Sequence, residues 1–496
     1  MSNSYRQIFK STALIGGTQV INIFLGIVRT KVLAILLGPS GMGIAGLYQS
    51  STGLVGTLAG LGIGSAGVRQ IAEAVGTGDE DRIARTVRTL RLTSALSGLL
   101  GMLVIVLFCG QIGYATFGNA SHTFGVALMS LTLLFGGISA GQTALLQGMR
   151  RLKHLASCQV LGVAFGTVVG ITLVYFLRER GIAPYLVAVS GFGILSSWWY
   201  ARKVRIEPVK ITAFEIVSES KGLLNMGLAF MVSGLLMTGT DYVTRVLISR
   251  QLGMNAVGLY SATWTLSSLY VGVILNSMGA DFYPRLTAAA SDDAVVNRLV
   301  NEQTEMGILI AIPGILVTLT LAPWVLRAFY SEAFVPAADV IRWQILGVAL
   351  RVVSWPMSFV QLGKGMSKLF MLTETVFAVV YVSLMLGCMK IWGLEGVGIS
   401  FFALYVSYSI AMLGVCNRIT GFSWSRRSLF IILSACCAVS AVLLMVRILP
   451  VEKGIVYGLI VTAAVLIGCL LELQRLLKID IKRFIPSGLN WVRTKM

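Results

Sequence analysis

Five cations fall inside long apolar stretches of this 496-residue chain, and chiefly two carboxylates accompany them. The cations are Arg29, Lys31, Arg245, Arg342 and Arg351, and the carboxylates are Asp241 and Glu374. A charge inside a membrane span costs about 2.5–3.5 kcal/mol on insertion scales, so most such groups face a cavity, a counter-charge or the head groups. The chemistry that the cations offer is anion binding, because Arg presents a planar fork of donors and Lys a point charge.

The amino-acid composition indicates which class of protein contains these charges. The chain is 56% hydrophobic and only 12% charged, about half the charged fraction of a soluble domain. Apolar stretches of about 20 residues recur, and each can cross a hydrocarbon layer about 30 Å thick. The sequence therefore predicts an all-α polytopic membrane protein. The net charge of +19 would suggest nucleic acid only if it formed a solvated basic face, and we expect no nucleic-acid partner.

The apolar stretches predict about fourteen transmembrane helices. They are 9–37, 42–66, 91–110, 122–148, 154–177, 183–201, 222–250, 254–280, 305–327, 336–363, 367–391, 394–417, 428–449 and 454–474. When sides alternate along the chain, 28 Lys and Arg residues fall on the side of the N-terminus, seven on the other side and five within spans. The positive-inside rule then predicts that both termini are cytoplasmic.

Three short motifs recur in order, at offsets of 212 to 217 residues. They are GMxxxGLY at 41–48 and 253–260, TKVL at 30–33 with TRVL at 244–247, and GMxRL at 148–152 with GMxKL at 365–369. Six helices per half is an even number, so both halves enter the membrane from the same side and the repeat is parallel. Parallel repeats are typical of transporters in which two lobes move around a central site.

The repeat predicts two six-helix lobes around a central cavity, followed by two additional helices. The expected parts are an N-terminal lobe over 1–205, a cytoplasmic linker over 206–221, a C-terminal lobe over 222–420, two further transmembrane helices over 421–475 and a basic cytoplasmic tail over 476–496. Tight turns join the first two helices of each lobe, because Gly reaches positive φ and Pro fixes its own φ. The residues assigned to these turns are Gly38, Pro39, Gly41, Gly46, Gly253 and Gly258.

The turn at 37–43, the Gly/Ala-rich second helix ending in GSAGVR at 64–69, and the stretch from Asp241 to Pro284 resemble one known family. Over residues 5–420 the chain is similar to Wzx-type polysaccharide (O-antigen-like) flippases of the multidrug/oligosaccharidyl-lipid/polysaccharide exporter superfamily. The extra helix pair is similar to the fourteen-helix lipid II flippase branch. The resemblance implies a flippase of lipopolysaccharide-type biosynthesis that moves undecaprenyl-diphosphate-linked oligosaccharides from the inner to the outer leaflet of the bacterial inner membrane by alternating access.

A diphosphate suits the intramembrane cations. Lys31 and Arg245 are repeat equivalents, each about 8–9 Å below the outer end of its helix, and would face one another if both point inward. The alternative is that both side chains extend to the outer head groups. Arg29 is roughly 200° around the helix from Lys31, so only one of those two can face the cavity. Arg351 lies near mid-membrane, where extension to head groups is hardest. The candidate diphosphate contacts are Lys31, Arg245, Arg351 and Arg29.

The two carboxylates are candidate charge partners or ion-coupling groups. Asp241 precedes Arg245 by four residues on the same helix face. It either neutralises that cation or titrates to couple substrate release to protons or sodium. Glu374 is a candidate partner of Arg351, although their depths differ by roughly 8 Å. Arg342 lies close to the outer interface and is expected to be an anchor.

Two other classes of function compete with the flippase. A multidrug antiporter for cations should carry acidic groups within its lobes, whereas the spans here hold five cations against chiefly two carboxylates. A membrane glycan polymerase or ligase needs sizeable outer loops, and the longest predicted one covers only 110–121. The sequence has no P-loop, dinucleotide fingerprint or metal-ligand cluster. We therefore expect no enzymatic activity, cofactor or metal. The expected partners are the lipid-linked substrate, membrane lipids and other polysaccharide-assembly proteins.

Overall fold

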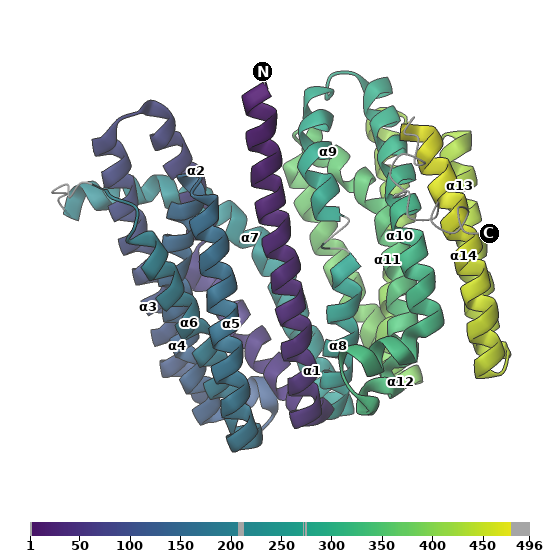
Figure 1. Cartoon of the computed structure of the whole chain (residues 1–496), viewed down its shortest axis with the longest axis horizontal. Helices are drawn as coiled ribbons and strands as arrows, with labels where there is room; N and C mark the ends of the chain where they lie inside the picture. The colour runs from purple at the N-terminus through teal and green to yellow at the C-terminus, as the bar shows by residue number, and fades with distance from the viewer. Residues whose placement is uncertain (1, 207–212, 271, 273–274, 478–496) are drawn as a thin grey trace, which may run out of the picture. The chain divides into compact units, whose positions relative to one another are not determined.

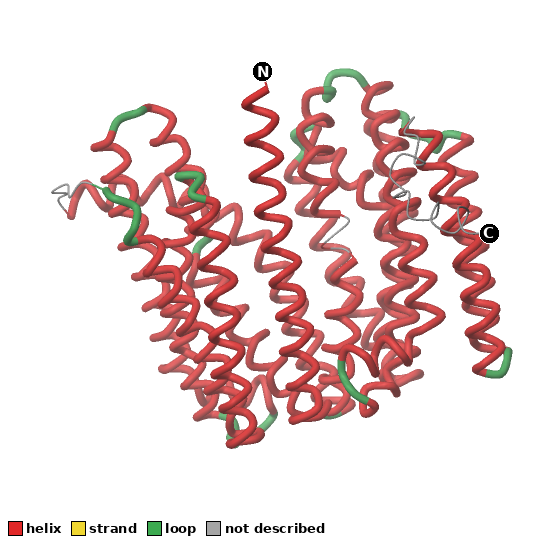
Figure 2. Tube along the Cα trace, in the orientation of Figure 1, coloured by secondary structure: helices red, strands yellow, loops and turns green. Residues whose placement is uncertain are grey.

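The computed structural model describes residues 2–206, 213–270, 272 and 275–477, and over that part of the chain it contains helices and no strand (Figure 2). The α-helices are α1 (Ser2–Gly60), α2 (Ile63–Thr77), α3 (Glu80–Phe117), α4 (Thr123–Gly148), α5 (Leu152–Leu177), α6 (Ile182–Ala201), α7 (Ala213–Leu252), α8 (Met254–Tyr270), α9 (Asn276–Ala288), α10 (Asp293–Phe329), α11 (Ala338–Gly363), α12 (Ser367–Thr420), α13 (Arg426–Ile448) and α14 (Val451–Leu477). Two short 3₁₀ helices, η1 (Arg178–Gly181) and η3 (Glu332–Ala337), join α5 to α6 and α10 to α11.

Two of these helices are long enough to cross a membrane twice. A straight helix the length of α1 or α12 would measure about 80–90 Å, more than twice the hydrocarbon thickness. Each is broken by a glycine with left-handed backbone, Gly38 (φ 64°) in α1 and Gly393 (φ 55°) in α12. The predicted turns after residues 37 and 391 are therefore confirmed, and each long helix has the length of two spans.

The helices are apolar enough for a multi-pass membrane protein. Nine helical segments of the described chain have the length and composition to cross a bilayer. Large apolar side chains point outward, among them Leu107, Phe176 and Phe430, which are 71–74% exposed. A water-soluble protein seldom exposes such surfaces, whereas lipid solvates them. The chain is an all-α polytopic membrane protein.

The two longest stretches between predicted spans, 67–90 and 281–304, are largely helical. The predicted second span ends at Gly60 rather than residue 66, because Leu61 and Gly62 both adopt left-handed φ. The chain then turns into α2, which buries Ile63 and Ile71 on one face. Asp79 caps the next helix, accepting a hydrogen bond from the Arg82 amide at 3.1 Å. Charged helical segments thus continue from apolar ones within each unit.

The chain packs as two compact units (Figure 1). Unit 1 comprises Met1–Ala262 and Arg327–Phe334, so it contains α1 to α7 and the first half of α8. Its buried core joins α2, α3, α4, α6 and α7 through residues that include Ile63, Leu90, Leu145, Ala201 and Leu223. Helices α3 and α4 approach closely where Gly98 meets Gly137, since a Cβ on Gly137 would lie 2.7 Å from the Gly98 Cα.

Unit 2 comprises Thr263–Leu326 and Val335–Met496. A buried cluster in this unit joins α9, α10, α11 and α12 through Phe282, Val300, Met357 and Met412, and includes Phe422 after α12. Helices α10 and α11 are the most buried of its described apolar spans.

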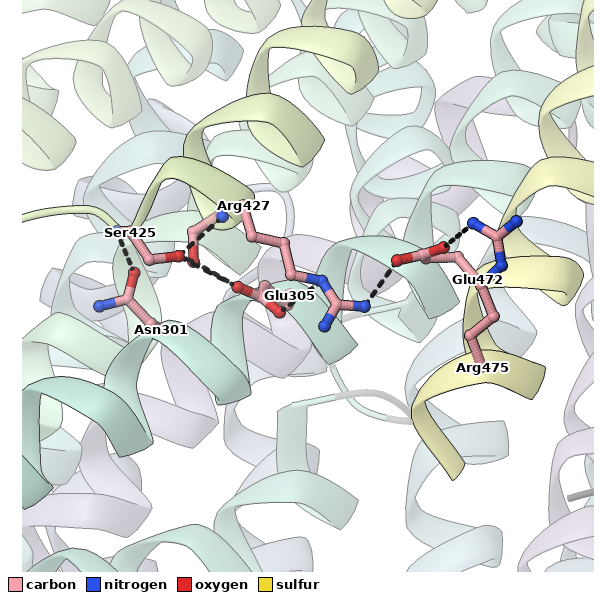
Figure 3. A network of polar contacts seen from close by, with 7 residues as sticks. Asn301, Glu305, Ser425, Arg427, Glu472 and Arg475 are labelled. Atoms are coloured by element: carbon pink, nitrogen blue, oxygen red, sulfur yellow. Dashed lines mark hydrogen bonds and ion pairs between the residues drawn. The ribbon is translucent and has the colours of Figure 1, made fainter. Parts of the chain in front are cut away.

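A polar network fastens the two C-terminal helices to the rest of unit 2 (Figure 3). Glu305 on α10 is buried, accepts a hydrogen bond from the Ser428 hydroxyl at 2.6 Å, and lies 3.6 Å from the Arg427 guanidinium. Arg427 in turn donates to Glu472 on α14 at 2.6 Å. One buried carboxylate therefore holds the start of α13, and α13 holds the end of α14.

Candidate functional site

The two copies of the GMxxxGLY motif pack against one another within unit 1. A Cβ on Gly258 would lie 2.6 Å from the Pro39 carbonyl carbon, and one on Gly43 would lie 3.0 Å from the Gly258 amide nitrogen. Only glycine allows two backbones to approach this closely. The second half of α1 and the start of α8 therefore cross in direct backbone contact, which we call the glycine crossing.

The predicted turn residues position this crossing. Gly38 breaks α1 ahead of Pro39, and Gly41 leaves room for Leu37, whose Cβ would lie 2.6 Å from a Cβ at position 41. Gly253, with φ 84°, ends α7 in the same way before α8 begins. The sequence predicted the two turns but not that they pack against each other.

Arg245 contacts both helices of the glycine crossing. Its Nε donates to both Asp241 carboxylate oxygens at 2.9 and 3.1 Å, and its Nη1 donates to the Ser261 hydroxyl. The guanidinium lies 5.8 Å from the Tyr260 ring centroid, and a Cβ on Gly46 would lie 2.7 Å from Nη1. The Arg245 side chain is only 12% exposed. Asp241 thus neutralises Arg245, and Gly46 provides the space for its guanidinium.

The cations of α1 have different surroundings. Lys31 donates from Nζ to the Arg327 carbonyl oxygen at the end of α10, and Arg327 itself pairs with Glu332. Arg29 lies within electrostatic range of the Tyr185 phenol on α6, and no described residue forms a hydrogen bond or ion pair with it. The repeat-equivalent cations of α1 and α7 therefore have separate partners instead of a shared one.

Arg351 lies on α11 beside Tyr405 of α12. Its guanidinium carbon is 5.8 Å from the Tyr405 ring centroid, within cation–π range, and it forms no ion pair among the described residues. Glu374 accepts a hydrogen bond from the Tyr408 hydroxyl at 2.8 Å. In this structure the Glu374 carboxylate is thus hydrogen-bonded to Tyr408, one helical turn from Tyr405, and forms no ion pair with Arg351.

Arg342 is held inside unit 2. Its Nη1 donates to Asp339 at 2.8 Å and its Nε to the Leu319 carbonyl oxygen at 3.3 Å. With 12% of its side chain exposed, Arg342 ties the start of α11 to α10.

Unit 1 contains a cavity of about 390 Å³, and none of the predicted site residues lines it. It is lined by glycine and small hydroxyl residues of α1 to α4, with Phe230 and Met231 of α7. The hydroxyls of Thr57, Ser94 and Thr132 donate to carbonyl oxygens of their own helices at 2.6–3.2 Å. Because each hydroxyl also has acceptor lone pairs, this wall can accept hydrogen bonds from a ligand rather than donate them.

Unit 2 contains a second cavity of about 390 Å³, between α10, α11, α12 and α13. Its lining is apolar and includes Ile312, Trp343, Leu350, Phe402 and Val439. Such a wall suits hydrocarbon and offers nothing to an anion.

Tyr48, the last residue of the first GMxxxGLY motif, reaches the loop before α4. Its hydroxyl lies 3.1 Å from His122 Nδ1, and the His122 ring stacks on Phe117 with centroids 4.3 Å apart. Burial lowers the pKa of His122, partly offset by Glu179. His122 therefore links α1 to the α3–α4 loop.

The fold of this chain is similar to the folds of two solved membrane proteins. The structure of the "lipid II flippase MurJ" in its inward closed conformation matches with a TM-score of 0.71 and 14% identity, over 94% of this chain and all of that chain. A multidrug resistance MATE family transporter of the MOP superfamily, in its inward-facing conformation, matches with a TM-score of 0.68 and 18% identity, over 81% of this chain and 95% of that one.

The sequence itself shows the family to which the chain belongs. A family model described as "polysaccharide biosynthesis protein" matches residues 32–339, more than half of the chain, and the protein belongs to this family. It is also 23% identical to the lipid III flippases of Escherichia coli strain K12 and Shigella flexneri over 439 residues, which cover 84% of this chain and 99% of each relative.

Proposed function

We propose that the protein is a flippase that moves an undecaprenyl-diphosphate-linked oligosaccharide from the inner to the outer leaflet of the bacterial inner membrane. The observation that carries this proposal is the match to two lipid III flippases along almost their whole length, within a polysaccharide biosynthesis family. The structure consists of apolar helices with cavities between them. We therefore propose that the protein transports its substrate and does not catalyse a chemical reaction.

The proposed mechanism is alternating access by two lobes of six helices, over 1–205 and 222–420, with both termini cytoplasmic. In this proposal, helices α13 and α14 are an addition to the second lobe. We also propose that the protein interacts with other polysaccharide-assembly proteins. The glycine crossing lies between the second half of α1 and the start of α8, segments that belong to different repeats. We propose that it forms and opens during the transport cycle.

We propose Arg29 and Arg351 as the strongest diphosphate contacts. Neither forms an ion pair with a described residue, so neither is already neutralised. Lys31 and Arg245 were equal candidates by sequence. Their donors are directed to the Arg327 carbonyl and to Asp241 and Ser261, so binding a diphosphate would require them to exchange partners.

The neutral part of the substrate has different requirements. Sugar hydroxyls are hydrogen-bond donors, and the wall of the unit 1 cavity presents acceptors. We propose that this cavity accommodates sugar hydroxyls and leaves the charged diphosphate to the cations.

The experiment that tests the function is deletion of the gene from its native bacterium. We expect completed lipid-linked sugar units to accumulate on the cytoplasmic leaflet, with surface polysaccharide restored by the wild-type gene. Unchanged surface polysaccharide together with loss of drug resistance would refute the flippase and favour a multidrug antiporter. Accumulation of single exported units on the outer leaflet would instead indicate a polymerase or ligase.

Variants of the cations test the site. Arg29→Gln and Arg351→Gln should each reduce export at normal membrane abundance, and Arg351→Lys should retain part of it. Arg342→Gln is a suitable control, because Arg342 is already paired with Asp339. Full export by both Arg29→Gln and Arg351→Gln would refute their assignment to the substrate while leaving the flippase function standing.

A further inference from the structure

The end of α6 combines exposed tryptophans with stacked cations. Trp198 and Trp199 are 51% and 48% exposed. The Arg202 guanidinium carbon lies 3.8 Å from the Trp199 ring centroid, and Lys203 Nζ lies 4.6 Å from that of Tyr200. Tryptophan and tyrosine at a span end lie at head-group level, so these cations are held at the depth of lipid phosphates.

The turn between α4 and α5 adds three more cations to the same place. Arg150, Arg151 and Lys153 are all exposed. The turn packs on the end of α6, where the His154 and Tyr200 rings are 5.7 Å apart. A small buried cluster also joins the two segments through Leu146, Cys158 and Val204.

The resulting basic patch is not neutralised by the described part of unit 1. It consists of Arg150, Arg151, Lys153, Arg202, Lys203 and Arg205. No ion pair with a described residue involves any of these six, and the acid nearest in sequence, Glu207, lies outside the described residues. By contrast, the exposed Arg285 and Arg298 each pair with a carboxylate four residues away, Asp281 and Glu302.

The backbone of Arg150 gives an independent reason to assign a ligand to this patch. Arg150 has φ 54°, in the left-handed region that favours glycine. Its amide donates to the Gln147 carbonyl, and the next amide donates to Leu146, which is the hydrogen-bond pattern of a Schellman cap. The fold therefore places an arginine where the backbone alone would select glycine.

The second repeat contains the same turn with glycine in that position. Gly365 has φ 74°, its amide donates to the Leu362 carbonyl, and the Met366 amide donates to Gln361. The turn geometry therefore does not require a side chain at this position. Strained residues of this kind are concentrated at binding sites, where the side chain serves a ligand rather than the fold.

We propose that the α4–α5 turn and the end of α6 form a binding site for the phosphate head group of an acidic phospholipid. The arginines offer planar donor forks that match phosphate oxygens. The exposed tryptophans fix the lipid at interfacial depth, and basic pockets between transmembrane helices are known to bind anionic lipid head groups. The site shares no residue with the candidate substrate cations Arg29 and Arg351.

The test is native mass spectrometry of the purified full-length protein, released from vesicles of phosphatidylcholine with or without phosphatidylglycerol. Retained phosphatidylglycerol is counted for the wild type, Arg150→Gly and the double variant Arg202→Gln with Lys203→Gln. Affinity should fall about fivefold for each cation removed, the factor expected for one basic residue near an anionic surface. The matched control, Arg285→Gln with Arg298→Gln, should retain wild-type binding.

Arg150→Gly separates binding from stability. It relieves backbone strain, so the variant should melt at a higher temperature than the wild type while holding less phosphatidylglycerol. Wild-type retention by Arg150→Gly and by the double variant would overturn the proposal. Equal retention of phosphatidylcholine, or complete displacement of the lipid by inorganic phosphate, would also overturn it, since the site would then not select an acidic lipid.

Discussion

Gly258→Ala should disrupt the glycine crossing. The added methyl group would lie 2.6 Å from the Pro39 carbonyl carbon, whereas carbon atoms in contact are about 3.5–4.0 Å apart. The start of α8 and the turn in α1 must therefore separate by about 1 Å or more, because the obstructing atoms are backbone and cannot rotate away. Separation also loosens the neighbouring contact between Gly43 and Gly258.

Over-packing typically costs about 1–3 kcal/mol, and a clash between two backbones belongs at the upper end of that range. If the clash destabilises only the state in which the crossing is closed, a cost of about 3 kcal/mol shifts the equilibrium between closed and open states roughly 150-fold toward the open state. We therefore expect a lower melting temperature in detergent and a protein that favours the open crossing in cells.

Thiol labelling measures this opening. Ile44 is 6% exposed and follows Gly43 in the chain, so a cysteine at position 44 should react slowly with a membrane-impermeant maleimide in the wild type. The exposed Cys436 and Cys437 are first replaced by serine to remove their signal. Gly258→Ala should increase the labelling rate at position 44 and reduce export.

Gly53→Ala is the matched control. Gly53 lies on the same half of α1, and an added methyl group there has no heavy atom within 4 Å. Alanine is favoured over glycine inside a helix by about 0.5–1 kcal/mol, so this variant should be at least as stable as the wild type. If Gly258→Ala matches Gly53→Ala in melting temperature, labelling and export, the closeness of the crossing has no functional importance and the reasoning fails.

Three further predictions concern individual side chains. Arg29→Gln or Arg351→Gln should weaken substrate affinity about 10- to 100-fold, since a hydrogen bond to a charged group is worth about 1.5–3 kcal/mol; undiminished export of lipid-linked sugar would contradict this. Glu305→Ala should destabilise unit 2 by about 1.5–3 kcal/mol, because Ser428 and Arg427 lose their acceptor; an unchanged melting temperature in detergent would count against the network. Because burial lowers the pKa of His122, the unfolded chain binds a proton there before the folded one does, so stability should fall as pH drops below about 6.5. His122→Gln should flatten that loss in a melting-temperature series, and an identical pH profile for both proteins would exclude His122 as its source.

Local spacing in the sequence predicted the contacts that lie within one helix. Residues four apart share a helix face, so the pairing of Asp241 with Arg245 could be expected. The 2.9 Å separation of their charged groups needs no tertiary partner, because both residues lie on α7. The break at Gly38 was also predictable, because glycine followed by proline favours a turn over a continuous helix.

Contacts between distant segments were not predictable in the same way. Arg351 and Glu374 are opposite charges on successive spans, yet the carboxylate accepts a hydrogen bond from Tyr408 instead. Which polar groups meet depends on helix rotation and side-chain shape at close packing, and neither is encoded in spacing along one helix. The sequence motif aligns Gly148 with Gly365, but the structure aligns the two turns differently. Arg150 and Gly365 make equivalent backbone hydrogen bonds, so they occupy the same position in the two turns.

The sequence by itself determined the class of protein, and it predicted the apolar spans and a repeat. These follow from hydrophobic length and composition, which the bilayer imposes on every segment separately. Only the tertiary structure showed that the two glycine motifs cross, that Arg245 is neutralised while Arg29 and Arg351 form no ion pair with a described residue, and that Arg150 adopts a glycine conformation beside exposed tryptophans. Such features depend on ångström-scale fit between segments far apart in the chain, because packing and polar pairing act at contact distance.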